Sequence, residues 1–184
     1  MSAYEVRRLR AEEWRQFRDI RLEALQDTPI GFGEWYADAV GKPDEEWRER
    51  ARRAAESSQS ALFGAINGGG RFVGITGVFP KAQPESPAAE SQPDEPIPLV
   101  YVIYSVYVTP DHRGPKHGVA ALLFDAVIAW AREFGGADVV TLLVHEDNAR
   151  AHTFYRRYGF VDTGESEPYN LDEAKSLLEL RYAG

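Results

Sequence analysis

The sequence predicts an α/β (α+β) fold with about seven strands and about four helices. Three observations support this: apolar β-branched runs, helical apolar stripes elsewhere in the chain, and turn residues between them. A length of 184 residues suits one ordinary domain, so we expect a single domain over 1–184. Residues 82–98 are rich in Pro, Glu, Ser and Ala without periodicity, which predicts a mobile loop between two strands.

The first part of the chain gives two helices and three strands. Residues 4–9 alternate as in a strand, and residues 11–25 have helical spacing that the turn "DTPIGFG" ends. A second helix is expected over 44–56, because Pro43 and several acidic residues mark its N-terminus. "ALFGAI" and "RFVGITGVF" flank the turn "NGGG", which predicts a hairpin.

The second part of the chain begins with a buried strand. Leu99–Val108 is β-branched and aromatic throughout, as expected for a strand at the centre of a sheet. An apolar-striped helix follows Gly118, Asp138–Val144 is another buried strand, and "NARAHTFYRRYGF" supplies a short helix. Short strands are expected near 160–162 and 177–182.

Composition excludes several classes of protein. The chain has no cysteine, which excludes disulfides, Cys-ligated zinc and thiol catalysis, and we expect no metal. A net charge of -8 weighs against nucleic acid as a partner. No apolar run approaches the roughly 18 residues of a membrane span, and Met1 is not followed by a basic then apolar segment. We therefore expect no membrane partner and a cytoplasmic location, and allow for a homodimer.

The loop Thr109–Gly118 gathers cations and glycines at the start of a helix. A helix N-terminus presents unpaired N–H groups and a positive dipole end, so this loop suits an anion such as phosphate. A surface turn with solvated cations is the alternative. The loop has neither the Gly-Lys-Ser/Thr of a Walker loop nor the G-x-G-x-x-G spacing of a dinucleotide site.

The order of these elements resembles the GNAT superfamily of acyl-CoA-dependent N-acyltransferases. The matching residues run in order along the chain: Val108, Pro110, Gly118, Val119, Ala120, Asn148, Ala151, Tyr155, Gly159 and Phe160. "RLEALQDTPIGFG" also looks like the family's first helix and substrate loop. The resemblance implies a mixed central sheet with a splayed central strand pair, acetyl-CoA as cosubstrate, and transfer of the acetyl group to a primary amine.

One part of the signature departs from the family pattern. Gly118 follows Arg113 two residues late, which places Pro115 at the position of the family's Arg or Gln. Either Arg113 reaches the pyrophosphate across a wider loop, or Pro115 removes one N–H donor and weakens the site.

The resemblance also implies roles for individual residues. Tyr155 corresponds to the acid that protonates the leaving sulfur, with a core tyrosine as the alternative, and Asn148 either caps its helix or contacts CoA. The cofactor-binding residues implied by the resemblance are Val106, Tyr107, Val108, Arg113, Gly114, Lys116, His117, Gly118, Val119, Ala120, Asn148 and Ala151.

The acceptor site and the general base are less well determined by the sequence. Phe32, Glu34 and Tyr36 follow the turn after the first helix and could line an acceptor pocket together with Tyr104. A water chain, Tyr104 or Glu34 are open options for the base. We expect an N-acetyltransferase for a small amine, a peptide N-terminus or a lysine. The alternative is a non-catalytic acyl-CoA-binding or scaffolding domain, suggested by the altered loop and the absence of a carboxylate from the central strand.

Overall fold

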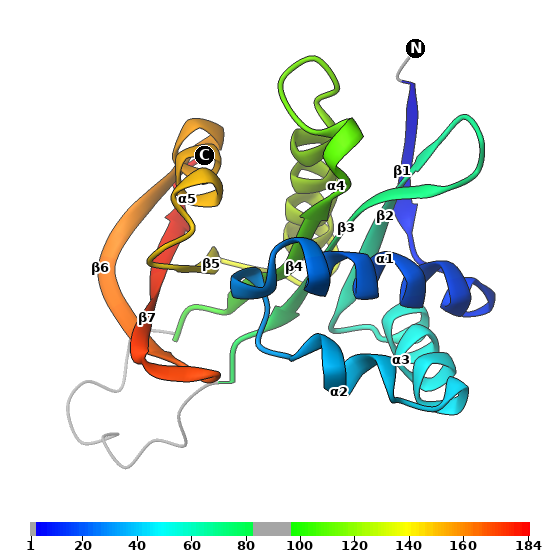
Figure 1. Ribbon diagram of the computed structural model, residues 1–184. Coiled ribbons are helices and arrows are strands. Elements are labelled where there is room, and N and C mark those ends of the chain that lie inside the picture. The colour runs from blue at the N-terminus through cyan, green and yellow to red at the C-terminus, as the bar shows by residue number, and fades with distance from the viewer. Residues whose placement is uncertain (1–2, 83–96) are drawn as a thin grey trace.

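The computed structural model describes residues 3–82 and 97–184, so most of the loop expected at 82–98 lies outside the described residues. Seven strands form one sheet in the order β1-β2-β3-β4-β5-β7-β6 (Figure 1). Only β4 and β5 pair in parallel; the other neighbours are antiparallel. The strands are β1 (Tyr4–Arg8), β2 (Ala61–Asn67), β3 (Phe72–Pro80), β4 (Val100–Val108), β5 (Val139–His145), β6 (Phe160–Tyr169) and β7 (Asp172–Tyr182). The predicted α/β class and mixed sheet are confirmed.

Five α-helices flank the sheet within the described residues, against about four expected: α1 (Trp14–Asp27), α2 (Tyr36–Val40), α3 (Asp44–Glu56), α4 (Val119–Glu133) and α5 (Ala149–Tyr158). Short 3₁₀ turns occur at Ala11–Glu13, Pro29–Gly31 and Pro110–His112. The additional helix is α2, whose five residues are too few to show a helical period in the sequence. The predicted bounds of α3 are confirmed.

The helices cover the two faces of the sheet and form two hydrophobic cores. One core lies under α1, α2 and α3 and contains Trp47 and Ile75, both fully buried. The other lies under α4 and α5 and is centred on Phe124, whose ring contacts the aromatic rings of α5. Burial of these apolar side chains holds both helical layers on the sheet.

The central strands β4 and β5 separate along their length. They pair only where Val100–Ile103 lies beside Val139–Leu142. Further along, β5 continues to pair with β7 and β4 with β3, so the two strands diverge. This geometry confirms the expected splayed pair. Unsatisfied main-chain groups are thus available between the strands.

The C-terminal hairpin is longer than the sequence predicts. β6 and β7 extend over 160–169 and 172–182, whereas we expected short strands at 160–162 and 177–182. The residues added to β6 are mostly exposed and polar, so they carry no alternating apolar pattern. Pairing with β7 at the edge of the sheet, rather than local preference, makes them a strand.

Candidate active site

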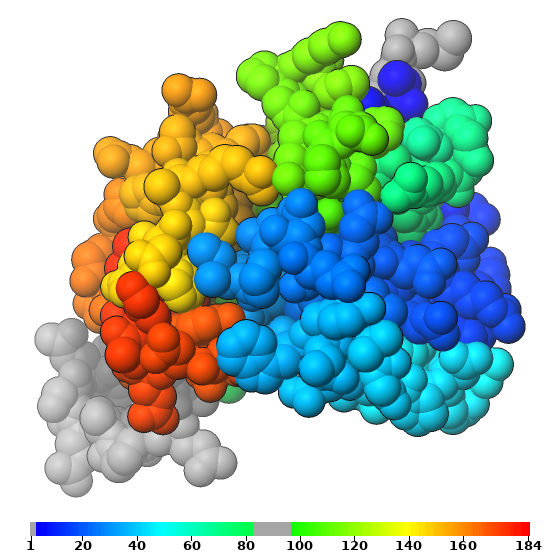
Figure 2. All heavy atoms as spheres, viewed as in Figure 1, coloured from blue at the N-terminus to red at the C-terminus, as the bar shows by residue number. Residues whose placement is uncertain are grey.

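A cavity of about 1090 Å³ fills the space where β4 and β5 diverge. It is lined by Val102–Val108 of β4, Leu142–His145 of β5, the N-termini of α4 and α5, and the segment after α1. Figure 2 shows the surface notch between the α5 region, in yellow and orange, and the loop before α4, in green. Two ligands that approach from opposite faces of the sheet can therefore meet between the two strands.

The N-terminus of α4 opens into this cavity without a side-chain cap. Gly118 stands at the N-cap position with φ of +66°, a left-handed conformation that glycine adopts readily. The first N–H bonded inside the helix is that of Leu122, which donates to the Gly118 carbonyl at 3.1 Å. The three preceding N–H groups, of residues 119–121, have no intrahelical partner, and Gly118, Ala120 and Ala121 line the cavity. These groups can bind an anion. The Val119 side chain itself is buried in the core, so only its main chain is available.

The two additional residues of the preceding loop fold into a closed turn. The N–H groups of His117 and Gly118 both donate to the carbonyl of Gly114, at 3.2 Å. Gly114 takes φ of +92° to make this turn. The turn uses the Gly118 N–H, and Pro115 contributes none, so main-chain donors to a ligand must come mainly from α4 itself.

Arg113 lines the cavity but is bonded within the protein. Its Nε donates to the Val108 carbonyl at 2.7 Å, and its Nη2 pairs with the carboxylate of Asp27. The guanidinium also lies 5.4 Å from the ring centroid of Tyr107. Burial alone would raise the pKa of Asp27, but hydrogen bonds from Arg113 and Thr28 lower it overall. Arg113 therefore ties the loop to β4 and α1.

Two loop residues expected to bind cofactor do not line the cavity. Lys116 is exposed on the turn, and His117 contacts β1 instead, where its Nδ1 lies 2.9 Å from the Tyr4 hydroxyl. The Nδ1 of His112 lies 2.8 Å from the same hydroxyl. The direction of the Gly114–Gly118 turn explains this correction, because it carries both side chains away from the cleft.

The N-terminus of α5 supplies two of the expected residues. The Oδ1 of Asn148 accepts from the Ala151 N–H at 3.3 Å. Asn148 therefore caps the helix, which is one of the two roles expected for it. Both residues line the cavity. Arg150, exposed at the cavity wall, was not predicted because it occupies a variable position of the motif.

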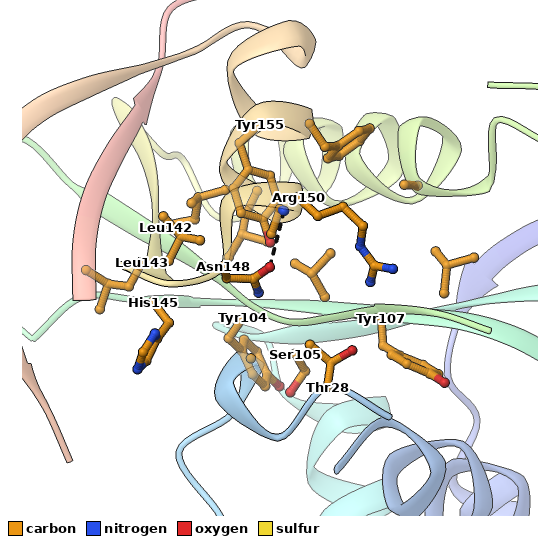
Figure 3. A pocket seen from close by; sticks show the side chains of 18 of the residues that line it. Thr28, Tyr104, Ser105, Tyr107, Leu142, Leu143, His145, Asn148, Arg150 and Tyr155 are labelled. Carbon is orange, nitrogen blue, oxygen red and sulfur yellow. Dashed lines mark hydrogen bonds between the residues drawn. The ribbon is translucent and has the colours of Figure 1, made fainter. Parts of the chain in front are cut away.

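Tyr155 projects from α5 into the cavity (Figure 3). Its ring packs 5.6 Å from that of Phe124, and 7% of its surface is exposed. Within residues 3–82 and 97–184 its hydroxyl has no hydrogen-bond partner. Burial raises the pKa of Tyr155, and the positive charge of Arg150 offsets only part of this. The hydroxyl is thus protonated at neutral pH and able to donate.

The opposite end of the cavity lies on the α1 and α2 side of the sheet. Tyr104 and the buried Phe32 line it, as expected, together with Tyr169 and Asn170 of the hairpin. The Tyr169 hydroxyl donates to the Phe32 carbonyl at 2.7 Å, and Asn170 Nδ2 donates to the Gly33 carbonyl at 3.0 Å. These bonds join the segment after α1 to the hairpin and fix this end of the cavity.

His145 is a further residue at this end that the sequence did not indicate. Its Nδ1 accepts from the Asp147 N–H at 3.1 Å, and its ring lies edge-on to Tyr169 at 4.8 Å. An accepting Nδ1 places the proton of a neutral imidazole on Nε2, so His145 is arranged as a donor.

Glu34 and Tyr36 do not line the cavity, contrary to expectation. Glu34 accepts from Arg21 at 3.1 Å and from Arg50 at 3.3 Å. Burial alone would raise the pKa of Glu34, but the hydrogen bond from Arg50 and the charge of Arg21 lower it overall. A carboxylate held by two arginines is a poor base, and Tyr36 packs at the edge of the core under α1.

The described cavity wall is basic although the chain is acidic. Its charged side chains are arginines, at positions 21, 113, 150 and 157, and no Asp or Glu of the described residues lines it.

Across residues 3–82 and 97–184, no group of three or more His, Cys, Asp or Glu side chains is arranged to hold a metal ion. No helix in that part of the chain has the length and apolarity to cross a membrane.

Comparison with known proteins identifies relatives of this chain. The family model described as "Acetyltransferase (GNAT) family" matches residues 6–160. The peptidyl-lysine N-acetyltransferase YjaB of Escherichia coli (strain K12) is 32% identical over 107 residues, which are 55% of this chain and 67% of that protein.

Solved structures show the same fold at low identity. A GNAT-family acetyltransferase from Streptococcus pneumoniae superposes with a TM-score of 0.71 at 15% identity, covering 97% of this chain and 98% of that one. PaiA N-acetyltransferase from Thermoplasma acidophilum, solved in complex with coenzyme A, gives 0.69 at 16% identity, covering 99% of this chain and all of that one (100%).

Proposed function

The chain belongs to the GNAT acetyltransferase family, and on that premise we propose how its cleft transfers the acetyl group of acetyl-CoA to an amine. Membership of the family supports the predictions of N-acetyltransferase activity and of acetyl-CoA as cosubstrate. Nothing in the described residues favours the alternative, a non-catalytic acyl-CoA-binding domain.

The cosubstrate is held by the diverging strands and the two helix N-termini. We assign its pyrophosphate to the free N–H groups at the start of α4, where the helix dipole favours negative charge. Arg150 adds positive charge at the same end of the cavity. The pantetheine arm lies between β4 and β5, beside the main chain of Val106, Tyr107 and Val108, since these residues line the cavity where the strands no longer pair.

The reaction is direct attack of a neutral amine nitrogen on the thioester carbonyl, followed by loss of the thiolate. Main-chain N–H groups of β4 near Ser105 stabilise the oxyanion that forms on the carbonyl oxygen. Tyr155 donates its proton to the departing sulfur, and its phenolate regains a proton by way of the water that takes the proton of the amine. The observation that carries this assignment is the Tyr155 hydroxyl, which lies in the cavity without a hydrogen-bond partner among the described residues, opposite the unpaired part of β4.

The acceptor amine enters from the end lined by Phe32 and Tyr104. We assign its proton to water in the cavity, because Glu34 is bound by arginines and burial raises the pKa of Tyr104, which makes that hydroxyl a poor base. The acceptor is a small amine, a peptide N-terminus or a lysine; the relation to a peptidyl-lysine N-acetyltransferase supports the last of these. The cytoplasmic location and the homodimer stay predictions.

Tyr155→Phe tests the role of the hydroxyl. The substitution keeps the ring and its packing on Phe124, so turnover should fall by about 10²- to 10⁴-fold, as is typical of general acid catalysis, while acetyl-CoA affinity changes little. Steady-state rates and calorimetric titration measure the two quantities. Tyr101→Phe is the matched control, because Tyr101 is buried in the same core without lining the cavity. Near-normal turnover of Tyr155→Phe, at unchanged melting temperature, would return Tyr155 to a structural role.

A further inference from the structure

Ser105 has an unusual backbone at the point where β4 leaves β5. Its φ of +54° makes it the only residue other than glycine with positive φ in the described part of the chain. The register with β3 also shifts here, since Ile75 pairs with Tyr107 but Gly77 pairs with Tyr104. One additional residue on β4 forms a β-bulge, and a serine in the left-handed region needs support from its surroundings.

Packing around the bulge is incomplete. A second cavity of about 370 Å³ lies on the far side of this segment, between β4, α1 and α3. Arg21, Tyr104 and Ser105 line both this cavity and the larger one. Ser105 therefore borders two cavities, and few side-chain bonds reach the bulge. One is from the β3 side, where Thr76 Oγ1 donates to the Tyr104 carbonyl at 3.2 Å.

The side chain of Arg21, on α1, makes such a bond. Its Nη1 donates to Ser105 Oγ at 2.7 Å, and its Nη2 donates to Glu34 Oε2 at 3.1 Å. The guanidinium also lies 4.5 Å from the ring centroid of Phe32. Arg50 in turn donates to the other oxygen of Glu34 at 3.3 Å. The two Nη atoms are thus fixed in one orientation by partners on both sides.

The cost of burying this cation argues for a specific use. Burial lowers the pKa of Arg21, and the charge and hydrogen bond of Glu34 oppose that change. Only 13% of the Arg21 side chain and 17% of the Glu34 side chain are exposed. A buried ion pair contributes little net stability, so we take the role of this pair to be the geometry that it fixes.

We propose that Arg21 is a positioning residue for acetyl transfer: it holds Ser105 in its left-handed conformation and so fixes the direction of the main-chain N–H groups that face the thioester. Glu34, rather than acting as a base, orients the Arg21 guanidinium. The proposal rests on the assignment of the cleft as the site of transfer.

A double-mutant cycle between the two residues tests the proposal. Arg21→Met and Ser105→Ala should each lower kcat by about 10- to 100-fold, the effect expected when reacting groups are misplaced. The KM values for acetyl-CoA and for the amine should stay within about threefold of the parent. Because both substitutions break the same bond, the kcat of the double variant should be no lower than that of the single variant with the lower kcat. Multiplicative losses would overturn the proposal.

Ser105→Gly separates positioning from a general structural role. Glycine adopts positive φ without support, so Ser105→Gly should keep most of kcat, and Arg21→Met should cost less in that background. An equal cost in both backgrounds would contradict the proposal, and a rise in the KM of the amine at unchanged kcat would make Arg21 an acceptor contact instead.

Two further variants guard against misfolding. Arg18→Met lies on the same helix and removes an exposed ion pair with Asp44, so it should keep normal turnover. If Arg21→Met lowers the melting temperature, Arg21→Lys keeps the charge beside Glu34 but cannot bridge Ser105 and Glu34 in the same geometry, and should still lower kcat. Failure of the proposed function would appear separately, as near-normal turnover of Tyr155→Phe.

Discussion

The N-termini of α4 and α5 both open into the cleft, but they satisfy their first N–H groups differently. The N-cap of α5 is Asn148, whose side chain accepts one of those N–H groups. The N-cap of α4 is Gly118, which has no side chain to offer. An unsatisfied helix terminus is unfavourable without a partner, so α4 is the terminus that is arranged for a ligand.

In the proposed function, this difference divides the work of one site between two similar elements. α4 contributes main-chain donors and its dipole, while α5, whose first turn is already capped, contributes side chains: Arg150 at the cavity wall and Tyr155 within it. Substitutions at three positions, Gly118, Arg150 and Asn148, separate these contributions, beginning with the one of largest expected effect.

Gly118→Pro should nearly abolish acetyl-CoA binding. Proline fixes φ near -65°, whereas Gly118 has φ of +66°, and it removes the N–H that closes the loop on Gly114. Displacing the first turn of α4 should lower the affinity for acetyl-CoA by at least about 100-fold in calorimetric titration. It should also remove the rise in melting temperature that the ligand produces in the parent protein.

A matched pair of alanine substitutions separates binding from stability. Gly118 and Gly136 have similar φ, +66° and +68°, and an added Cβ at either meets no atom within 4 Å. Gly118→Ala and Gly136→Ala should both lower the free energy of unfolding by about 1–2 kcal/mol, but only Gly118→Ala should lower the affinity for acetyl-CoA. Equal affinities in the two variants would show that the α4 terminus does not hold the ligand.

Arg150→Met should have an intermediate effect. Losing one charged contact should raise the KM of acetyl-CoA by about 10-fold at low salt, and the difference should shrink at high salt because exposed charges are screened. Arg156→Met is the control, since Arg156 is on the same helix but pairs with Asp162 and does not line the cavity. A salt-independent change would mean that Arg150 acts through packing rather than charge.

Asn148→Ala should have the smallest effect on the ligand. Loss of a helix cap costs about 1 kcal/mol, so the melting temperature should fall by about 2–4 °C. Acetyl-CoA affinity should stay within about threefold of the parent, because the Asn148 oxygen is already used by the Ala151 N–H. A loss of affinity larger than that of Arg150→Met would instead support the second predicted role of Asn148, contact with CoA.

The sequence predicts those parts of the fold that have strong local signals. The stripe of α4, the Pro-Asp start of α3 and the Asn67–Gly70 turn all occur where expected. The five-residue helix α2 and most of the β6–β7 hairpin lack such signals, and they form because tertiary contacts and strand pairing hold them.

The site divides in the same way. Residues within the family motif, such as Gly118 and Tyr155, line the cavity as expected. Lys116 and His117 do not, because the loop insertion turns on Gly114 in a direction that no local pattern specifies. The bond from Arg21 to Ser105 joins positions 84 residues apart, so it follows only from the packing of α1 on the sheet.

A structure with coenzyme A bound tests the central claim most directly. The account predicts the pyrophosphate within hydrogen-bond distance of the N–H groups of residues 119–121, and the sulfur within hydrogen-bond distance of the Tyr155 hydroxyl. A pyrophosphate on the N-terminus of α5, or a sulfur beyond the reach of Tyr155, would contradict the division of work between the two helices.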